Sequence, residues 1–552
     1  MRVYNQDLRA NLEIVRRELR LTDNPILHHI SELHSKDQAP FSHLLPVYVF
    51  PARQVEVGGF LDPATATCHS AKTDEPSSRC TDRLPEFPTT IESPYPPARS
   101  VVAGFPRCGP HRARFWTESV WEFKNGLESI GSGLAIRVGR IDDILENMLH
   151  EFKRESAVKR EVVGVWITAE DGVAEKTDER NVFRVAGLKK IPVRVWKDEK
   201  YLIDDRDLPY MTPKEVPDSF AEFRKTAACL RTASRKTLPR PASLPPLPGR
   251  IPAQPIPFRV PTTLDGWIAG LLKPLYDTPV AAIIPPWPLT AVPQHADLGG
   301  EAYALERLKH LIASGATTTY RYPHLSSHGE DRRTKLTAWL ALGCITARQI
   351  NEHLLDFEEG RTALGHHADG YGIGENGGTA SIRAELLWRD YLRLCTRKYG
   401  CKLFRLEGFK GDMDRAWKHG DDPDVNRQIQ RFVEGRTGVP VVDTALREMS
   451  STGYTSDHAR QIAATYFGRQ LGIDWRIGAE WFEYCLVDYD VSGNWGHWQY
   501  WAGVGNDPVG YLNLGRKREG NEEQEDCLKA RLDADNLVTL QSNRREMQRT
   551  LY

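Results

Sequence analysis

The sequence lacks several features that would assign a protein to a class at once. No run of about 18 apolar residues occurs, so we expect no transmembrane helix. The start, MRVYNQDLRANLEIV, lacks the apolar centre of a secretory signal. The nine cysteines form no CxxC pair and no cluster with histidine at metal-ligand spacing. We therefore expect free thiols in a reducing, intracellular compartment, with no disulfide framework and no metal; the sequence does not indicate which compartment.

The chain also lacks a large net charge. The chain has 73 Lys and Arg against 74 Asp and Glu, so its total charge gives no signal for nucleic acid. No GxGxxG or GxxxxGK[ST] motif follows a predicted strand, which excludes the usual dinucleotide and P-loop sites. Locally, residues 381–420 hold ten Lys and Arg against five Asp and Glu, interleaved with aromatics. This stretch is either a patch that meets phosphates or a solvated helix face.

What is present first indicates an α/β domain. At 552 residues the chain is too long for one ordinary core. Helical periodicity separates short β-rich apolar runs, as expected for parallel strands. These runs cover residues 12–15, 44–50, 134–138, 162–168 and 191–196. We predict a doubly wound parallel sheet over residues 1–210, with an irregular excursion over residues 51–110. A helix should begin with Pro25 in its first turn, after the candidate capping residues Thr22, Asp23 and Asn24.

The rest of the chain changes character twice. Residues 211–298 are rich in proline and predict a long connector that could run along the surface, with one short helix near LDGWIAGLL. Residues 299–515 show helical periodicity with glycine stops and predict an all-helical domain. Residues 516–552 are charged and predict a polar tail.

Aromatic and charged side chains gather in the helical part. Seven of the fourteen tryptophans lie between residues 388 and 501, and each could simply fill a core. The stretch DYDVSGNW places Asp488 and Asp490 after an apolar helix and before a predicted Gly-Asn turn. Arg389 and Arg460 are candidate partners for these carboxylates. Such a cluster is either a structural salt bridge or a site for a large polar, aromatic cofactor.

Two further patterns suit a ligand. In ELLWRDY, Glu385, Trp388 and Arg389 share one helix face. In RRTKLTAW, Thr334, Lys335 and Thr337 precede an apolar helix, where backbone N–H groups could bind a phosphate; a plain helix cap is the alternative.

Several long motifs resemble the cryptochrome/photolyase family, and within it the DASH cryptochromes. They include WRDYLRLCTRKYG, EGRTGVPVVDTALREM, TGYTSDHARQ, GIDWRIGAEWFEYCLVDYDV and NWGHWQYWAGVGNDP. RRELRLTDNPIL and RARFWTESVWEFKNGLESIGSGLAIRVGR are similar to the α/β domain of that family. The resemblance covers roughly residues 12–515, with gaps in the excursion and the connector.

The resemblance implies non-covalent FAD in the helical domain and methenyltetrahydrofolate as an antenna at the α/β domain. The residues implied around the FAD are Tyr320, Thr334, Lys335, Thr337, Glu385, Arg389, Arg460, Asp488, Asp490 and Asn494. Asn494 would face flavin N5. Trp498, Trp475 and Trp417 would relay electrons to the flavin. Glu170 lies in the region that contacts the antenna, although an ordinary surface acid is the alternative.

The resemblance also implies an activity. Glu385, Trp388, Gln461 and Tyr500 would line a pocket for a flipped pyrimidine dimer. We expect blue-light-driven repair of cyclobutane pyrimidine dimers, mainly in single-stranded DNA, by electron transfer from reduced flavin in a monomer. The alternatives are a blue-light receptor with little repair, and a nucleic-acid-binding regulator that needs no light.

The sequence departs from the family pattern at several positions. PHL replaces TRN at residues 323–325, EDRRTKLT replaces DYSTKFS, and LNLGRK replaces FNxxKQ. Ile382 stands where an aromatic is common, and Asp457 stands where the family has asparagine. These departures bear on repair more than on flavin binding.

Overall fold

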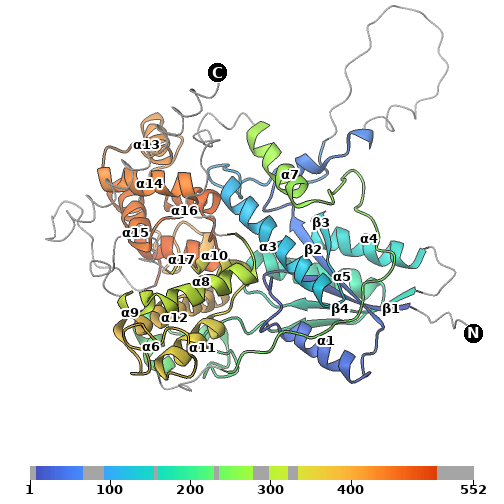
Figure 1. Cartoon of the computed structure of the whole chain (residues 1–552). Helices are drawn as coiled ribbons and strands as arrows, with labels where there is room; N and C mark the ends of the chain where they lie inside the picture. Colours follow the sequence, from blue (N-terminus) through green and yellow to red (C-terminus); the bar gives the residue numbers. More distant parts are fainter. Residues whose placement is uncertain are drawn as a thin grey trace, which may run out of the picture. The chain divides into compact units, whose positions relative to one another are not determined.

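A computed structural model describes residues 8–65, 92–154, 160–228, 235–277, 298–320 and 334–506 (Figure 1). The chain divides into two compact units. The first contains residues 1–278, 297–401 and 487–493, and the second contains residues 279–296, 402–486 and 494–552. The domain boundaries that the sequence suggests, at residues 210, 298 and 515, stay predictions. The tail 516–552 and the altered segment 323–325 lie outside the described residues.

A five-stranded parallel sheet organises the first unit, as the sequence predicts. Its strands are β1 (Leu8–Val15), β2 (His43–Pro51), β3 (Ala135–Gly139), β4 (Arg160–Thr168) and β5 (Val193–Trp196). The order β3-β2-β1-β4-β5 reverses direction at β1, which makes the fold doubly wound. The strands are apolar runs because helices cover both faces of the sheet.

Four helices cover the sheet. They are α1 (Pro25–Ser35), α3 (Pro110–Ser129), α4 (Ile141–Arg154) and α5 (Val173–Leu188). One apolar core contains residues of α1 and α3, and a second contains residues of α4 and α5. The predicted start of α1 is confirmed: Asn24 Oδ1 accepts the backbone N–H groups of Ile26 and Leu27, with Pro25 as the first helical residue.

The proline-rich segment is more ordered than the sequence predicts. The predicted helix is present as α7 (Leu264–Asp277), but a second helix, α6 (Phe220–Ala228), was not predicted. Parts of the segment are buried, because Phe223, Leu244 and Trp267 are at most 3% exposed. Proline prevents regular strand and helix, but it does not prevent the intervening aromatic side chains from joining a core.

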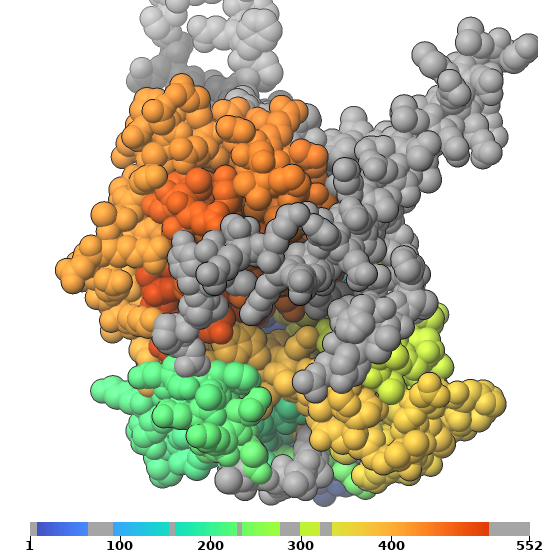
Figure 2. Space-filling view, turned by 90° about the vertical axis from the view of Figure 1, so that its left-hand side faces the viewer, coloured from blue at the N-terminus to red at the C-terminus, as the bar shows by residue number. Residues whose placement is uncertain are grey.

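All regular secondary-structure elements that the structure describes from Glu301 onward are helices, as predicted. In the first unit these helices are α8 (Glu301–Ala313), α9 (Ala316–Thr319), α10 (Thr337–Leu342), α11 (Ala347–Glu358) and α12 (Gly377–Tyr399). In the second unit they are α13 (Pro423–Val433), α14 (Pro440–Thr452), α15 (Asp457–Thr465) and α16 (Trp475–Cys485). On the face shown in Figure 2, the orange residues of α13 to α15 form much of the surface of the second unit.

The predicted Gly-Asn turn at residues 492–494 is wrong. These residues lie in α17 (Val491–Ala502), inside which the division between the units falls. Each helical glycine costs about 1 kcal/mol relative to alanine. Burial of Trp495, Trp498 and Trp501, each at most 6% exposed, outweighs this cost. Asp490 caps the helix, since its Oδ1 accepts the Gly493 N–H at 2.8 Å.

Two kinds of feature are absent from the part of the chain that the structure describes. No helix there is long and apolar enough to cross a membrane. No group of three or more His, Cys, Asp or Glu side chains there could hold a metal ion.

Candidate functional site

The predicted site residues are divided between the two units. The first unit contains Tyr320, Thr334, Lys335, Thr337, Glu385, Trp388, Arg389, Asp488 and Asp490. The second contains Trp417, Arg460, Gln461, Trp475, Asn494, Trp498 and Tyr500. Each set has its own internal geometry.

In the first unit, the structure joins two motifs that are far apart in sequence. Thr337 is the first residue of α10, and its hydroxyl donates a 2.7 Å hydrogen bond to Asp488 Oδ2. Asp488 is 7% exposed and lies in the segment between α16 and α17. The two motifs that were expected to bind one cofactor therefore contact each other directly.

Lys335 has an unusual backbone conformation. Its φ of 55° is in the left-handed region, which non-glycine residues rarely adopt and which often marks functional sites. The preceding carbonyl, that of Thr334, accepts a 3.2 Å hydrogen bond from Arg307 Nε. Both residues are half-buried at the entry to α10.

The partner of Asp490 is a residue that the sequence reasoning missed. Arg17 Nη1 lies 3.3 Å from Asp490 Oδ2, and Arg17 Nη2 lies 3.7 Å from Glu175 Oε1. Burial alone disfavours the Arg17 cation, but the carboxylates of Glu175 and Asp490 outweigh burial and raise its pKa. Arg17 lies two residues after the end of β1, so its ion pair with Asp490 links the end of a sheet strand to the start of α17. Its place in RRELR was the only sequence signal.

Arg389 does not pair with Asp490. Its Nη2 donates to the Leu340 carbonyl at 3.0 Å, and its guanidinium lies 5.0 Å from the centroid of the Tyr201 ring. Its Nη1 is buried and has no hydrogen-bond partner among the described residues. A buried guanidinium N–H without a partner is costly, so this nitrogen is free to donate to a ligand.

The face of α12 also carries Glu385 and Trp388. The Tyr320 hydroxyl lies 2.8 Å from both oxygens of Glu385 and donates to that carboxylate. Trp388 packs edge-on against Phe220 of α6, with ring centroids 4.7 Å apart. Glu385 is exposed and Trp388 is half-buried. The shared helix face is confirmed, and Tyr320 holds its acid in place.

In the second unit, α16 and α17 surround Trp498. The indole is 0% exposed and meets Phe482 edge-on at 5.0 Å. A Cβ at Gly478 would lie 2.2 Å from the indole, so only glycine fits there. One helical turn earlier, Asn494 Nδ2 donates to the Ala479 carbonyl at 3.0 Å. Asn494 and Trp498 are four residues apart and therefore share one face of α17.

Trp475 and Trp417 lie on neighbouring segments. Trp475 is 0% exposed, and its indole N–H donates to the Leu406 carbonyl at 3.0 Å. The Lys418 N–H donates to the Gly472 carbonyl, and the Asp474 N–H donates to the Lys418 carbonyl. The segment that bears Trp417 thus pairs with the segment that leads into Trp475.

Other aromatics of α17 have packing contacts. Trp495 meets Trp475 edge-on, with ring centroids 5.8 Å apart. His497 stacks on Trp501, with ring centroids 4.9 Å apart. Tyr500 on the same helix is half-buried.

Helix α15 carries the remaining predicted residues. Arg460 Nε donates to the Thr455 carbonyl at 2.9 Å, and its guanidinium lies 5.3 Å from the Tyr454 ring. Gln461 is half-buried, and Asp457, the first residue of the helix, is exposed. Asp457 and Gln461 are four residues apart, so they share one helix face.

Glu170 is not an ordinary surface acid. It is 7% exposed, and its Oε1 lies 2.5 Å from Lys200 Nζ, which is itself 3.5 Å from Asp198. The carboxylate therefore belongs to a buried charge cluster, and the surface-acid alternative is wrong.

Comparisons with known proteins agree with this arrangement. The family model for the FAD binding domain of DNA photolyase matches residues 382–525. A mitochondrial Neurospora crassa sequence assigned to cryptochrome DASH is 42% identical over 523 residues, which are 91% of this chain; the chain spans 66% of that relative. Cryptochrome DASH of Xenopus laevis is 36% identical over 409 residues, 73% of this chain and 68% of the relative.

A solved structure gives the same result. The cryptochrome of Synechocystis sp. has a TM-score of 0.70 at 26% identity, over 95% of this chain and 88% of that chain. The parallel sheet, the helical part and the matched motifs lead to one conclusion. The chain belongs to the cryptochrome DASH branch of the cryptochrome/photolyase family and carries the FAD-binding domain of that family.

Proposed function

We propose that this protein repairs cyclobutane pyrimidine dimers, mainly in single-stranded DNA, with FAD and blue light. The observation that carries the proposal is the link between Thr337 and Asp488, together with the unpartnered Nη1 of Arg389. The motif resemblance assigns these residues to the flavin, and Arg389 Nη1 supplies a buried donor for a ligand.

The residues present fit an FAD. In the first unit, Thr334, Lys335 and Thr337 would contact its phosphates and ribose. Glu385, Arg389, Asp488 and Asp490 would bind its polar edges, and the resemblance assigns Arg460 and Asn494 to the same cofactor. When bound in reduced form, FAD supplies the light-driven electron that splits the dimer.

Asn494 supplies a neutral group at this site. Its Nδ2 is held by the Ala479 carbonyl at 3.0 Å, which fixes the orientation of the amide. A neutral amide adds no negative charge beside a reduced, anionic flavin, whereas a carboxylate would repel it.

Glu385 would act on the lesion. It would hydrogen-bond the dimer as negative charge develops there, which stabilises the reacting state more than the bound substrate. Tyr320 positions Glu385 at 2.8 Å. The resemblance also assigns Trp388, Gln461 and Tyr500 to the lesion, and aromatic rings can stack on flipped bases.

Glu385→Gln is expected to slow repair by at least roughly tenfold, because it removes a group that responds to developing charge. The measurement is repair of a single-stranded oligothymidine that contains a dimer, by reduced, FAD-loaded protein under blue light. Glu306→Gln, at an exposed position on α8, is the matched control and is expected to repair at the normal rate. A Glu385→Gln variant with normal repair and normal FAD content contradicts the assigned role.

Arg17→Gln is expected to weaken FAD retention by about tenfold, because Asp490 loses its cation and α17 its anchor. Equilibrium dialysis of FAD measures this change. Arg17→Lys should restore part of the FAD affinity. The control is Arg9→Gln, at an exposed position near the other end of β1, and it should leave the FAD affinity unchanged. Unchanged FAD affinity in Arg17→Gln would show that the pair has no role at the site.

One observation favours a blue-light receptor with little repair. Asp457 places an exposed carboxylate on the same face of α15 as Gln461, where it would repel the phosphates of a lesion strand. If the wild-type protein reduces its flavin in light but leaves the dimer intact, and Asp457→Asn gains repair, the receptor is the correct assignment. A colourless purified protein would instead indicate a regulator that needs no light.

A folate antenna at the α/β domain is part of the proposal and rests on the family resemblance. The buried pairing of Glu170 with Lys200 gives this carboxylate a structural partner already. Acid extraction of the purified protein tests for methenyltetrahydrofolate beside FAD. The monomeric state also stays a prediction.

A further inference from the structure

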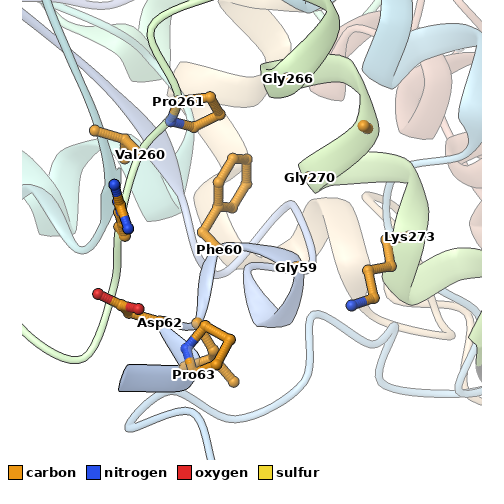
Figure 3. Close-up of a pocket in the computed structure, with 12 residues that line it drawn as sticks. Gly59, Phe60, Asp62, Pro63, Val260, Pro261, Gly266, Gly270 and Lys273 are labelled. Atoms are coloured by element: carbon orange, nitrogen blue, oxygen red, sulfur yellow. The ribbon is translucent and has the colours of Figure 1, made fainter. Parts of the chain in front are cut away.

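A cavity of about 450 Å³ lies in the first unit and contains none of the predicted flavin or lesion residues. It forms where α7 crosses the segment after β2 (Figure 3). Its lining comes from three short stretches, residues 59–63, 259–261 and 266–273. The volume is in the range of small-molecule sites.

The floor of the cavity is apolar and tightly packed. Phe60 is 2% exposed and packs on Trp267 of α7, with ring centroids 5.1 Å apart. A Cβ at Gly59 would lie 2.0 Å from the Gly270 carbonyl oxygen, and a Cβ at Gly270 would lie 2.4 Å from the Phe60 ring. The absence of a side chain at both glycines lets α7 approach the segment closely. This close packing fixes the shape of the cavity floor.

The rim of the cavity is charged. Arg259 and Lys273 are both exposed, and neither has an ion pair within the part of the chain that the structure describes. Asp62 is the one carboxylate of the lining, and its Oδ1 already accepts the Ala64 N–H at 3.1 Å. Lys273 points toward the space beside Gly59 and Pro63 (Figure 3). The lining therefore has one net positive charge over an apolar floor.

We propose that this cavity binds a small organic anion with a flat apolar body, either an aromatic carboxylate or an aryl phosphate. The flat body would lie on the apolar lining, and the two cations of the rim, Arg259 and Lys273, would attract the anionic group. A cation is disfavoured by the net charge of the rim, and a purely ionic ligand would gain nothing from the apolar lining.

Isothermal titration of the purified full-length protein with 1-naphthyl phosphate and with 2-naphthoate tests the proposal. We expect binding of at least one probe, and the stronger one identifies the anionic group. Inorganic phosphate lacks the aromatic body and uncharged 1-naphthol lacks the anionic group. Each should therefore bind at least roughly tenfold more weakly. Equal binding of 1-naphthol would overturn the role of the two cations, and no binding of either anion would overturn the site.

Variants locate the binding. Lys273→Gln and Arg259→Gln should each weaken the better probe by about fivefold to tenfold. Ala269→Phe, at an exposed lining position, should abolish binding by filling the cavity. Lys214→Gln, an exposed lysine outside the cavity, is the matched control. All four variants should keep wild-type flavin absorbance and helical content. Equal affinity in Ala269→Phe and wild type would place the probe elsewhere and overturn the proposal.

Discussion

Replacing Trp498 by phenylalanine is expected to slow the light-driven reduction of the flavin by at least roughly tenfold. Benzene is much harder to oxidise than indole, so phenylalanine cannot donate the electron. Trp498 lies four residues after Asn494 on α17, which places the two side chains on one helix face. Its indole is 0% exposed and packs against Gly478, so water does not reach the ring.

The matched control is Trp481→Phe. Trp481 is 1% exposed and stacks on Tyr484, so it is equally buried in the same unit and has no assigned relay role. Both variants lose similar apolar volume and should lose similar stability, about 1 to 3 kcal/mol. Absorbance under blue light gives the rate, and FAD content shows that the site is intact. Equal photoreduction in Trp498→Phe and wild type would falsify the relay.

Glu13→Gln is expected to stabilise the protein strongly at alkaline pH. Glu13 lies in β1 opposite Pro46 and Trp166, is 0% exposed, and neither carboxylate oxygen has a partner among the described residues. Burial disfavours the ionised form, and the nearby charge of Glu18 adds to this, so the pKa of Glu13 rises to about 8. Strand β1 therefore contains a carboxyl group that is protonated at neutral pH.

The direction of the pH dependence follows from this shift. Because the folded pKa is above the unfolded value of about 4.3, folding takes up a proton between these two pH values. The free energy of unfolding of the wild type should fall as pH rises from about 4.5 to 8 and then level off. Glutamine cannot ionise, so Glu13→Gln should match the wild type near pH 4.5 and exceed it by several kcal/mol, on the order of 3 to 5, near pH 8.5.

Urea unfolding at these two pH values measures the difference. Glu146→Gln, an exposed position on α4, is the control and should change stability by less than about 0.5 kcal/mol at either pH. If Glu13→Gln has the same advantage at both pH values, the effect comes from packing and not from the proton.

Much of the fold could be predicted because its signals are local. The apolar runs gave all five strands, and the capping pattern at Asn24-Pro25 gave the start of α1. Residues 492–494 could not be predicted in the same way. Ser492, Gly493 and Asn494 favour a turn, and the burial that makes them helical comes from distant side chains.

For the candidate site, too, local features could be predicted and long-range contacts could not. The residue types that suit a flavin could be named from the motifs, because each motif is short and continuous. The partners could not, because Arg17 and Asp490 are 473 positions apart and Thr337 and Asp488 are 151 apart. The cavity beside α7 also gave no sequence signal, since its lining comes from three separate stretches.

By itself, the sequence determined the family, the parallel sheet and the helical FAD-binding part, because periodicity and motif spacing are properties of neighbouring residues. Only the tertiary structure decided that α17 is a helix, that Arg17 anchors Asp490, and that the proline-rich segment enters a core. Each of these depends on burial and ion pairing between residues far apart in the chain, and those contacts exist only after the chain has folded.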